Sequence, residues 1–142
     1  VPVVGFAGDG AFGIAVTELT AIGRDEWPPI TMIVFRNYQW GAEKRNSTLW
    51  YDDNFIGTEL DDKVSYAGIA QACGLKGVQT HTMEALTAAL HTAIEDQMKH
   101  GKTTLIEAMI NQELGEPFRR DAMKAPVSVA GISADDMQVQ TV

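Results

Sequence analysis

Two short polar segments hold the residues with the most specific chemistry in this sequence. Gly8-Asp9-Gly10 directly follows an apolar run from Val1 to Ala7, and Arg36-Asn37 directly follows a second apolar run from Ile30 to Phe35. Mg²⁺ in proteins is typically bound through hard oxygen ligands, one or two carboxylates together with substrate phosphates and water. If the fold brings Asp9 and Asn37 together, their oxygens and one loop carbonyl predict a magnesium site for a phosphorylated ligand.

The spacing of the two segments predicts the structural unit that would bring them together. The interval from Gly10 to Asn37 has room for one amphipathic helix, a turn at Trp27-Pro28-Pro29 and one buried strand. A parallel crossover has this length, since it needs a dozen or more residues and usually contains a helix. Both strands then end at the same edge of the sheet, where ligands bind in open α/β folds. We therefore expect Asp9 and Asn37 to face one another at that edge.

This pattern resembles that of the thiamine diphosphate-dependent enzymes, which carry Gly-Asp-Gly, an interval of about this length, and then Asn or Asn-Asn. Asn37 matches the second Asn, whereas Arg36 stands where many members have the first. The resemblance implies that Mg²⁺ takes the Asp9 carboxylate, the Asn37 side chain and the main-chain carbonyl of Gln39. The residues expected to bind the cofactor, including the backbone N–H groups of Gly10 and Ala11 for its diphosphate, are Gly8, Asp9, Gly10, Ala11, Asn37, Gln39, Trp40 and Gly41.

The same glycines fit a second interpretation. The segment from Gly8 to Gly13 is a literal G-x-G-x-x-G between a strand and a helix, the dinucleotide-binding pattern. That fold places an acidic residue about 20 residues further on, but the second strand ends at Arg36-Asn37, and Asp25 and Glu26 precede it. Asp9 would also point its charge at a pyrophosphate with no metal between them. The sequence favours thiamine diphosphate with Mg²⁺, and leaves a dinucleotide or a structural glycine-rich turn as alternatives.

Composition and charge narrow the class of protein. The 142 residues are 45% hydrophobic and 21% charged, which is typical of a globular domain. The formal net charge of -8 disfavours nucleic acid and anionic membranes as partners, because binding to phosphate backbones depends on Lys and Arg. One cysteine, Cys73, cannot form an internal disulfide, and no apolar run approaches the length of a membrane span. We expect a cytoplasmic protein.

Hydrophobic periodicity predicts an α/β fold over residues 1–112, with a doubly wound parallel sheet flanked by helices, the form that the resemblance to the thiamine enzymes implies. The expected strands are Val1–Ala7, Ile30–Phe35, Gly77–Thr80 and Thr103–Ile110. The expected helices run from Ala11 to about Arg24, from Lys63 to Cys73 with Asp62 as the cap, and from the Thr82 cap to about Lys99. Residues 113–142 show little periodicity, which predicts an extended arm with partial disorder.

For the other polar and aromatic residues the sequence gives less specific predictions. The segment from Tyr38 to Thr58 predicts a long functional loop. For Trp50 and Phe55 two interpretations have equal weight. One is a place in this functional loop, and the other is an interface or a short helix that packs its aromatic side chains into the core. Cys73 is expected in the core, and the three histidines, His81, His91 and His100, are expected to be surface or packing residues.

The catalytic acid is expected elsewhere. The resemblance places the Glu that activates the cofactor in a separate N-terminal pyrimidine-binding domain, normally from a partner subunit of a homodimer or homotetramer. The sequence offers no candidate for this Glu, and Val1 falls inside an expected strand with no initiator Met. We therefore expect the chain to be truncated at its N-terminus and to have little activity alone.

Two segments point to one subfamily. Residues 37–46 and 116–124 resemble the sulfoacetaldehyde acetyltransferases, and the resemblance also takes in residues 54–60. It implies conversion of sulfoacetaldehyde and phosphate into acetyl phosphate and sulfite. Both substrates are anions, and an Arg fork matches tetrahedral oxyanions well, so Arg119 and Arg120, with Lys124, are candidate contacts. Pairing of the two arginines with Asp121 or with a neighbouring subunit is an equal alternative.

Two further functions remain open at this point. An acetolactate synthase, or another 2-oxo acid decarboxylase, would share the fold and the metal loop. A non-catalytic fragment that binds only the cofactor or a partner is the alternative from another class.

Overall fold

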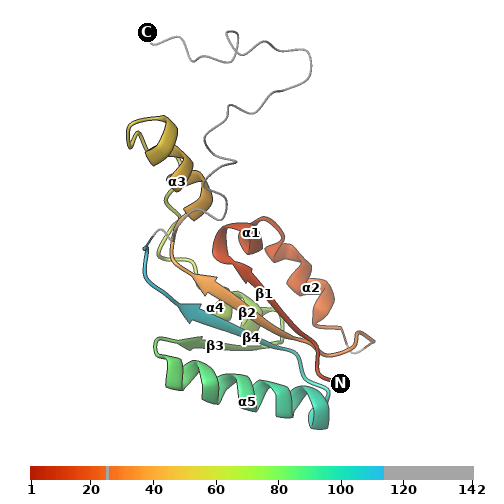
Figure 1. Ribbon diagram of the computed structural model, residues 1–142. Coiled ribbons are helices and arrows are strands. Elements are labelled where there is room, and N and C mark those ends of the chain that lie inside the picture. Colours follow the sequence, from red (N-terminus) through yellow and green to blue (C-terminus); the bar gives the residue numbers. More distant parts are fainter. Residues whose placement is uncertain (25, 114–142) are drawn as a thin grey trace.

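The computed structural model describes residues 1–24 and 26–113, and its centre is one parallel sheet of four strands in the order β1-β2-β4-β3 (Figure 1). The strands are β1 (Val4–Gly8), β2 (Thr31–Arg36), β3 (Lys76–Thr80) and β4 (Thr104–Met109). Ala7 pairs with Val34, and Phe35 pairs with Ala108. This register brings the carboxyl ends of β1, β2 and β4 to one edge, as the crossover length predicts for β1 and β2.

Helices cover both faces of the sheet, which confirms the predicted α/β class. They are α1 (Asp9–Ile14), the 3₁₀ turn η1 (Val16–Glu18), α2 (Leu19–Ile22), α3 (Gly41–Trp50), α4 (Tyr66–Ala72) and α5 (Met83–His100). Successive side chains of a strand point to opposite faces. Val34 therefore packs with Leu19 and Ala70 on one face, while Ile33 packs with Ala93 on the other. Within the described residues, no helix is both long enough and apolar enough to cross a membrane.

The first helical segment differs from the single helix expected from Ala11 to Arg24. It is divided into α1, η1 and α2, because the backbone leaves the helical region at Ala15 (φ -110°, ψ 17°). Gly13 before the break and the β-branched residues Val16 and Thr17 after it are poor helix formers. The division lets α1 stay short while Leu19 in α2 still reaches the core.

The helix expected from Lys63 to Cys73 is shorter than predicted and has a different cap. It starts at Tyr66, and Ser65 rather than Asp62 caps it by accepting the N–H of Gly68 at 3.0 Å. Residues 61–64 stay outside the helix because the Arg36 side chain donates to the carbonyls of Asp61 and Val64. A contact distant in sequence therefore overrides the local capping signal.

Two other segments test the remaining expectations. The segment expected to be a loop contains α3, which projects beyond the carboxyl ends of the strands (Figure 1). Trp50 at its end and Phe55 beyond it do not enter the core, since they are 48% and 42% exposed. The long helix α5 agrees with prediction: Thr82 caps it, and Gly101, with a φ of 63°, ends it. Residues 114–142, which hold nearly all of the expected arm, lie outside the described residues.

We expect Gly77→Ala to destabilise the fold strongly. A Cβ at this position of β3 would lie 2.0 Å from the main-chain oxygen of Ala67 in α4. Over-packing costs about 1–3 kcal/mol or more, and a backbone atom cannot rotate away, so the upper part of this range applies. Urea unfolding measures the loss.

Gly68→Ala, in α4, is the matched control. Its Cβ would meet only the Ser65 side chain, at 3.3 Å, and alanine favours a helix by about 1 kcal/mol over glycine. Equal stability of the two variants would contradict the close contact between β3 and α4.

Candidate metal and cofactor site

The carboxylate of Asp9 joins the carboxyl ends of the first two strands. Asp9 follows β1 and is 2% exposed. Its Oδ2 accepts the backbone N–H groups of Asn37 and Tyr38 at 3.1 and 2.7 Å, and its Oδ1 accepts that of Gly10 at 3.0 Å. The structure therefore brings Asp9 and the Asn37 segment together, as the spacing predicts, although the contact is to the backbone of Asn37 and not to its amide.

The loop after β2 turns sharply beside this carboxylate. Tyr38 has a φ of 60°, and the side-chain Oδ1 of Asn37 accepts the N–H of Gln39 at 3.3 Å. In the described part of the chain, no hydrogen bond ends on the main-chain carbonyl of Gln39. The turn whose backbone the carboxylate holds thus carries an amide oxygen and a free carbonyl.

These oxygens fit a Mg²⁺ ion by their chemistry. They are one carboxylate, one amide and one carbonyl, all hard donors of the kind that Mg²⁺ prefers, and few enough to leave places for water and phosphate. Among the described residues, no group of three or more His, Cys, Asp or Glu side chains gathers as a metal site. A metal at this edge would therefore rest on one carboxylate and neutral oxygens.

The residues expected around the diphosphate lie at the start of α1 and of α3. Gly10 and Ala11 are in the first turn of α1, where backbone N–H groups lack partners inside the helix. A Cβ on Gly10 would come 2.9 Å from the Trp40 ring, so the ring packs directly on this turn. A Cβ on Gly8 would meet nothing within 4 Å, which leaves open space beside the β1–α1 junction. Gly41 begins α3, directly after Trp40.

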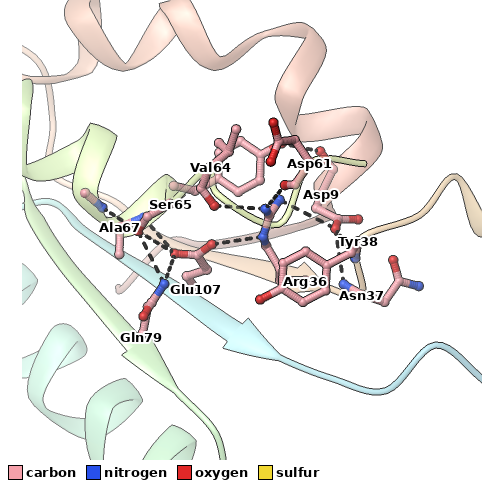
Figure 2. A network of polar contacts seen from close by, with 12 residues as sticks. Asp9, Arg36, Asn37, Tyr38, Asp61, Val64, Ser65, Ala67, Gln79 and Glu107 are labelled. Carbon is pink, nitrogen blue, oxygen red and sulfur yellow. Dashed lines mark hydrogen bonds and ion pairs between the residues drawn. The ribbon is translucent and has the colours of Figure 1, made fainter. Parts of the chain in front are cut away.

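Arg36, which the sequence singles out only as a departure from the family pattern, is central to the site. It ends β2 and is 1% exposed. Figure 2 shows its guanidinium between the carboxylates of Asp9 and Glu107. Nη1 lies 3.8 Å from Asp9 Oδ2, and Nε lies 3.3 Å from Glu107 Oε1. The rings of Tyr38 and Tyr66 lie 4.4 and 4.9 Å from the guanidinium carbon, in cation–π contact.

Glu107, which sequence reasoning missed, is the second carboxylate of this network. It lies in β4 and is fully buried. Its Oε2 accepts the Ser65 hydroxyl at 3.1 Å, the Ala67 N–H at 3.0 Å and the Gln79 amide at 2.9 Å. A signal was present in the sequence: an acid inside one apolar strand and an arginine at the end of another predict a buried pair.

Tyr66 supports Asp9 from the α4 side. Its hydroxyl donates to the main-chain oxygen of Asp9 at 3.0 Å. Burial raises the pKa of Tyr66, the adjacent Arg36 charge lowers it, and the net shift is upward. Tyr66 therefore keeps its proton and remains a hydrogen-bond donor.

The histidines and Cys73 are not part of the site. All three histidines are exposed, as expected. Cys73 packs against the cluster that contains Leu19 and Val34, which confirms a core role. Arg119, Arg120 and Lys124 lie outside the described residues.

Comparison with known proteins identifies the family. Residues 1–108 match the family described as thiamine pyrophosphate enzyme, C-terminal TPP binding domain. The chain belongs to this family. Thiamine pyrophosphate is another name for thiamine diphosphate, the cofactor of these enzymes. The domain built on the parallel sheet is the one that binds it.

Similar proteins narrow the relationship further. The chain is 77% identical, over 141 residues, to sulfoacetaldehyde acetyltransferase of Roseovarius nubinhibens and 78% identical, over 139 residues, to that of Rhodobacter capsulatus. These matches cover 99% and 98% of the chain but 23% of each relative, so the chain spans about a quarter of their length. Among solved structures, benzoylformate decarboxylase of Polynucleobacter necessarius matches with a TM-score of 0.71 and 25% identity, covering 80% of this chain and 20% of that one.

We expect Tyr66→Phe to lower the free energy of unfolding by about 1 kcal/mol, the net contribution of one hydrogen bond. The ring stays, and with it the edge-to-face contact with Phe12, so the change removes only the hydroxyl that donates to Asp9. Urea unfolding of the two proteins gives the difference. Tyr51→Phe, at an exposed position, is the control and should be neutral. A neutral Tyr66→Phe would refute the role of this bond.

Proposed function

We propose that this chain is the cofactor-binding part of a thiamine diphosphate- and Mg²⁺-dependent sulfoacetaldehyde acetyltransferase. This enzyme converts sulfoacetaldehyde and phosphate into acetyl phosphate and sulfite, a step of sulfonate catabolism. The observation that carries the proposal is the identity of 77% and 78% to proteins of that name over almost the whole chain. The oxygen donors at the sheet edge support the cofactor and metal part of the proposal.

The proposed magnesium ligands are the Asp9 carboxylate, the Asn37 amide oxygen and the Gln39 carbonyl. The charge of the network favours a cation, because two buried carboxylates and one guanidinium leave one negative charge. A diphosphate brought to this edge alone would meet that charge. Mg²⁺ removes the conflict, since it binds carboxylate and phosphate oxygens together.

Residues of this chain hold and orient the cofactor. Bound thiamine diphosphate supplies a thiazolium carbanion that attacks a carbonyl carbon. The N–H groups of Gly10 and Ala11 are the proposed diphosphate donors, although that of Gly10 donates to Asp9 Oδ1 in this structure. Trp40 closes the glycine turn by packing on Gly10. Arg119 and Arg120 are proposed contacts for the sulfonate or phosphate of the substrates.

The proton-transfer acid is proposed to come from another domain. Glu107 is not available for this task, since it is fully buried and already bonded to three donors and to Arg36. A Glu of a pyrimidine-binding domain, contributed by a partner subunit of a homodimer or homotetramer in the cytoplasm, would complete the site. The 142 residues alone should then bind cofactor weakly and turn over little substrate.

A 2-oxo acid decarboxylase, such as an acetolactate synthase, is the second candidate. A structural neighbour at 25% identity is named benzoylformate decarboxylase, which favours this candidate less than identities near 78% favour the first. The two functions differ in the product that leaves: sulfite in one, carbon dioxide in the other.

We expect Asp9→Ala, in the full-length protein, to weaken Mg²⁺-dependent binding of thiamine diphosphate by about 100-fold or more, since even outer-shell changes cost about 10–100-fold in metal affinity. Isothermal calorimetry with and without Mg²⁺ measures this. Asp9→Asn keeps an acceptor for the Asn37 and Tyr38 N–H groups and separates loss of charge from loss of folding. Asp96→Ala, at a residue of α5 that pairs with Lys76, is the control. Undiminished binding in both Asp9 variants, or binding of a nicotinamide dinucleotide instead, would overturn the metal assignment.

The full-length protein should release sulfite from sulfoacetaldehyde and form acetyl phosphate only when phosphate, Mg²⁺ and thiamine diphosphate are all present. A sulfite assay and an acetyl phosphate assay on the same samples test this directly. Release of carbon dioxide from pyruvate without sulfite release would favour the decarboxylase.

A further inference from the structure

We propose that Glu107 is a positioning residue for the metal ligand Asp9 and acts through Arg36. It holds the guanidinium and offsets its charge, so that the Asp9 carboxylate keeps its own negative charge for the divalent cation. This inference rests on the proposed metal role of Asp9.

The first support is the way in which Asp9 is held. Its three hydrogen bonds come from backbone N–H groups, which are neutral donors. Arg36 lies near, but its Nη1 is 3.8 Å from Oδ2, which is too long for a hydrogen bond. Asp9 is thus oriented by neutral groups, while the nearby cation is not bonded to it.

The second support is the way in which Arg36 is held away from Asp9. Its Nη2 donates to the carbonyls of Asp61 and Val64 at 2.7 and 2.8 Å, and its Nε is 3.3 Å from Glu107 Oε1. The ionic contact to Glu107 is therefore the shorter of its two. Figure 2 shows Val64 and Glu107 on the side of the guanidinium opposite Asp9.

The third support is the rigidity of Glu107. Three donors fix Oε2, from Ser65, Ala67 and Gln79. Oε1 and Arg36 Nε have no hydrogen bond within the described part of the chain, and each has the other as its ionic partner. Oε1 is therefore left facing the guanidinium, where its charge can offset that of Arg36.

The consequence for a metal follows from charge alone. Arginine cannot lose its proton in a protein, so without Glu107 its full positive charge would stand 3.8 Å from Asp9. Charges interact strongly where water is excluded. Arg36 would then compete with Mg²⁺ for the Asp9 carboxylate, and the affinity for Mg²⁺ would fall.

The test compares single and double variants of the ion pair in the full-length protein. Calorimetry gives the Mg²⁺ concentration for half-maximal binding of thiamine diphosphate, and thermal unfolding of the cofactor-free proteins gives stability separately. We expect Glu107→Gln to raise the half-maximal Mg²⁺ concentration about tenfold, the lower end of outer-shell effects on metal affinity. The double variant Arg36→Gln/Glu107→Gln, which restores the charge of the network, should return to within about threefold of wild type. Glu95→Gln, an exposed carboxylate of α5 paired with Lys99, is the control and should not change it.

If the Glu107–Arg36 pair only stabilises the fold, the Mg²⁺ titration gives a different result. In that case the double variant binds Mg²⁺ no better than Glu107→Gln, and this outcome overturns the inference, as does an unchanged Mg²⁺ requirement in Glu107→Gln. If Glu107→Gln fails to fold, the double variant decides: an affinity within about threefold of wild type supports the inference, and a loss of tenfold or more refutes it. Wild-type protein without any Mg²⁺-dependent binding would instead refute the proposed function, so the two failures are distinguishable.

Discussion

The edge of this sheet depends on one constraint, the hydrogen bonding of the buried Asp9 carboxylate. A buried charge without partners is very unfavourable, so the backbone must supply donors. The N–H groups of Asn37 and Tyr38 do so, and the chain turns directly after them through the positive φ of Tyr38. Such a conformation is uncommon for a bulky residue and persists only where its surroundings impose it. Here the two hydrogen bonds and the guanidinium of Arg36 over the Tyr38 ring impose it. The strained turn and the aspartate are therefore parts of one arrangement that holds the ends of β1 and β2 together.

The other buried carboxylate organises the opposite side of the same edge. Glu107 lies between Val34 of β2 and Gln79 of β3 in the sheet register. It faces α4, whose first-turn N–H at Ala67 donates to it, and a negative charge near a helix N-terminus is stabilising. Arg36 links this carboxylate to the carbonyls of residues 61 and 64. The start of α4, the preceding loop and the end of β2 are thus held by one ion pair.

Much of the fold and of the site follows from the sequence, and each failure has a physical cause. The four strands, the long helix α5 and the juxtaposition of Asp9 with the Asn37 segment follow from apolar runs, a Thr cap and the length of one crossover. The start of α4 does not, because contacts of Arg36 and Glu107, far away in the chain, decide it. Helix α3 has few apolar positions, so periodicity gives no signal for it. Local patterns predict what local forces determine, and the buried ion pair is not a local feature.

The same ion pair helps to distinguish between the two ligands that the glycine turn could bind. A G-x-G-x-x-G turn is equally suited to a dinucleotide, and its backbone alone does not discriminate. The buried charges do, because Asp9 and Glu107 outnumber Arg36 and leave the edge negative. A pyrophosphate approaching such an edge without a metal meets repulsion that low dielectric strengthens. A divalent cation between the carboxylate and the phosphate reverses the sign of the interaction. The match of residues 1–108 to a thiamine pyrophosphate-binding family agrees with this electrostatic argument, which uses two residues, Arg36 and Glu107, outside the glycine motif.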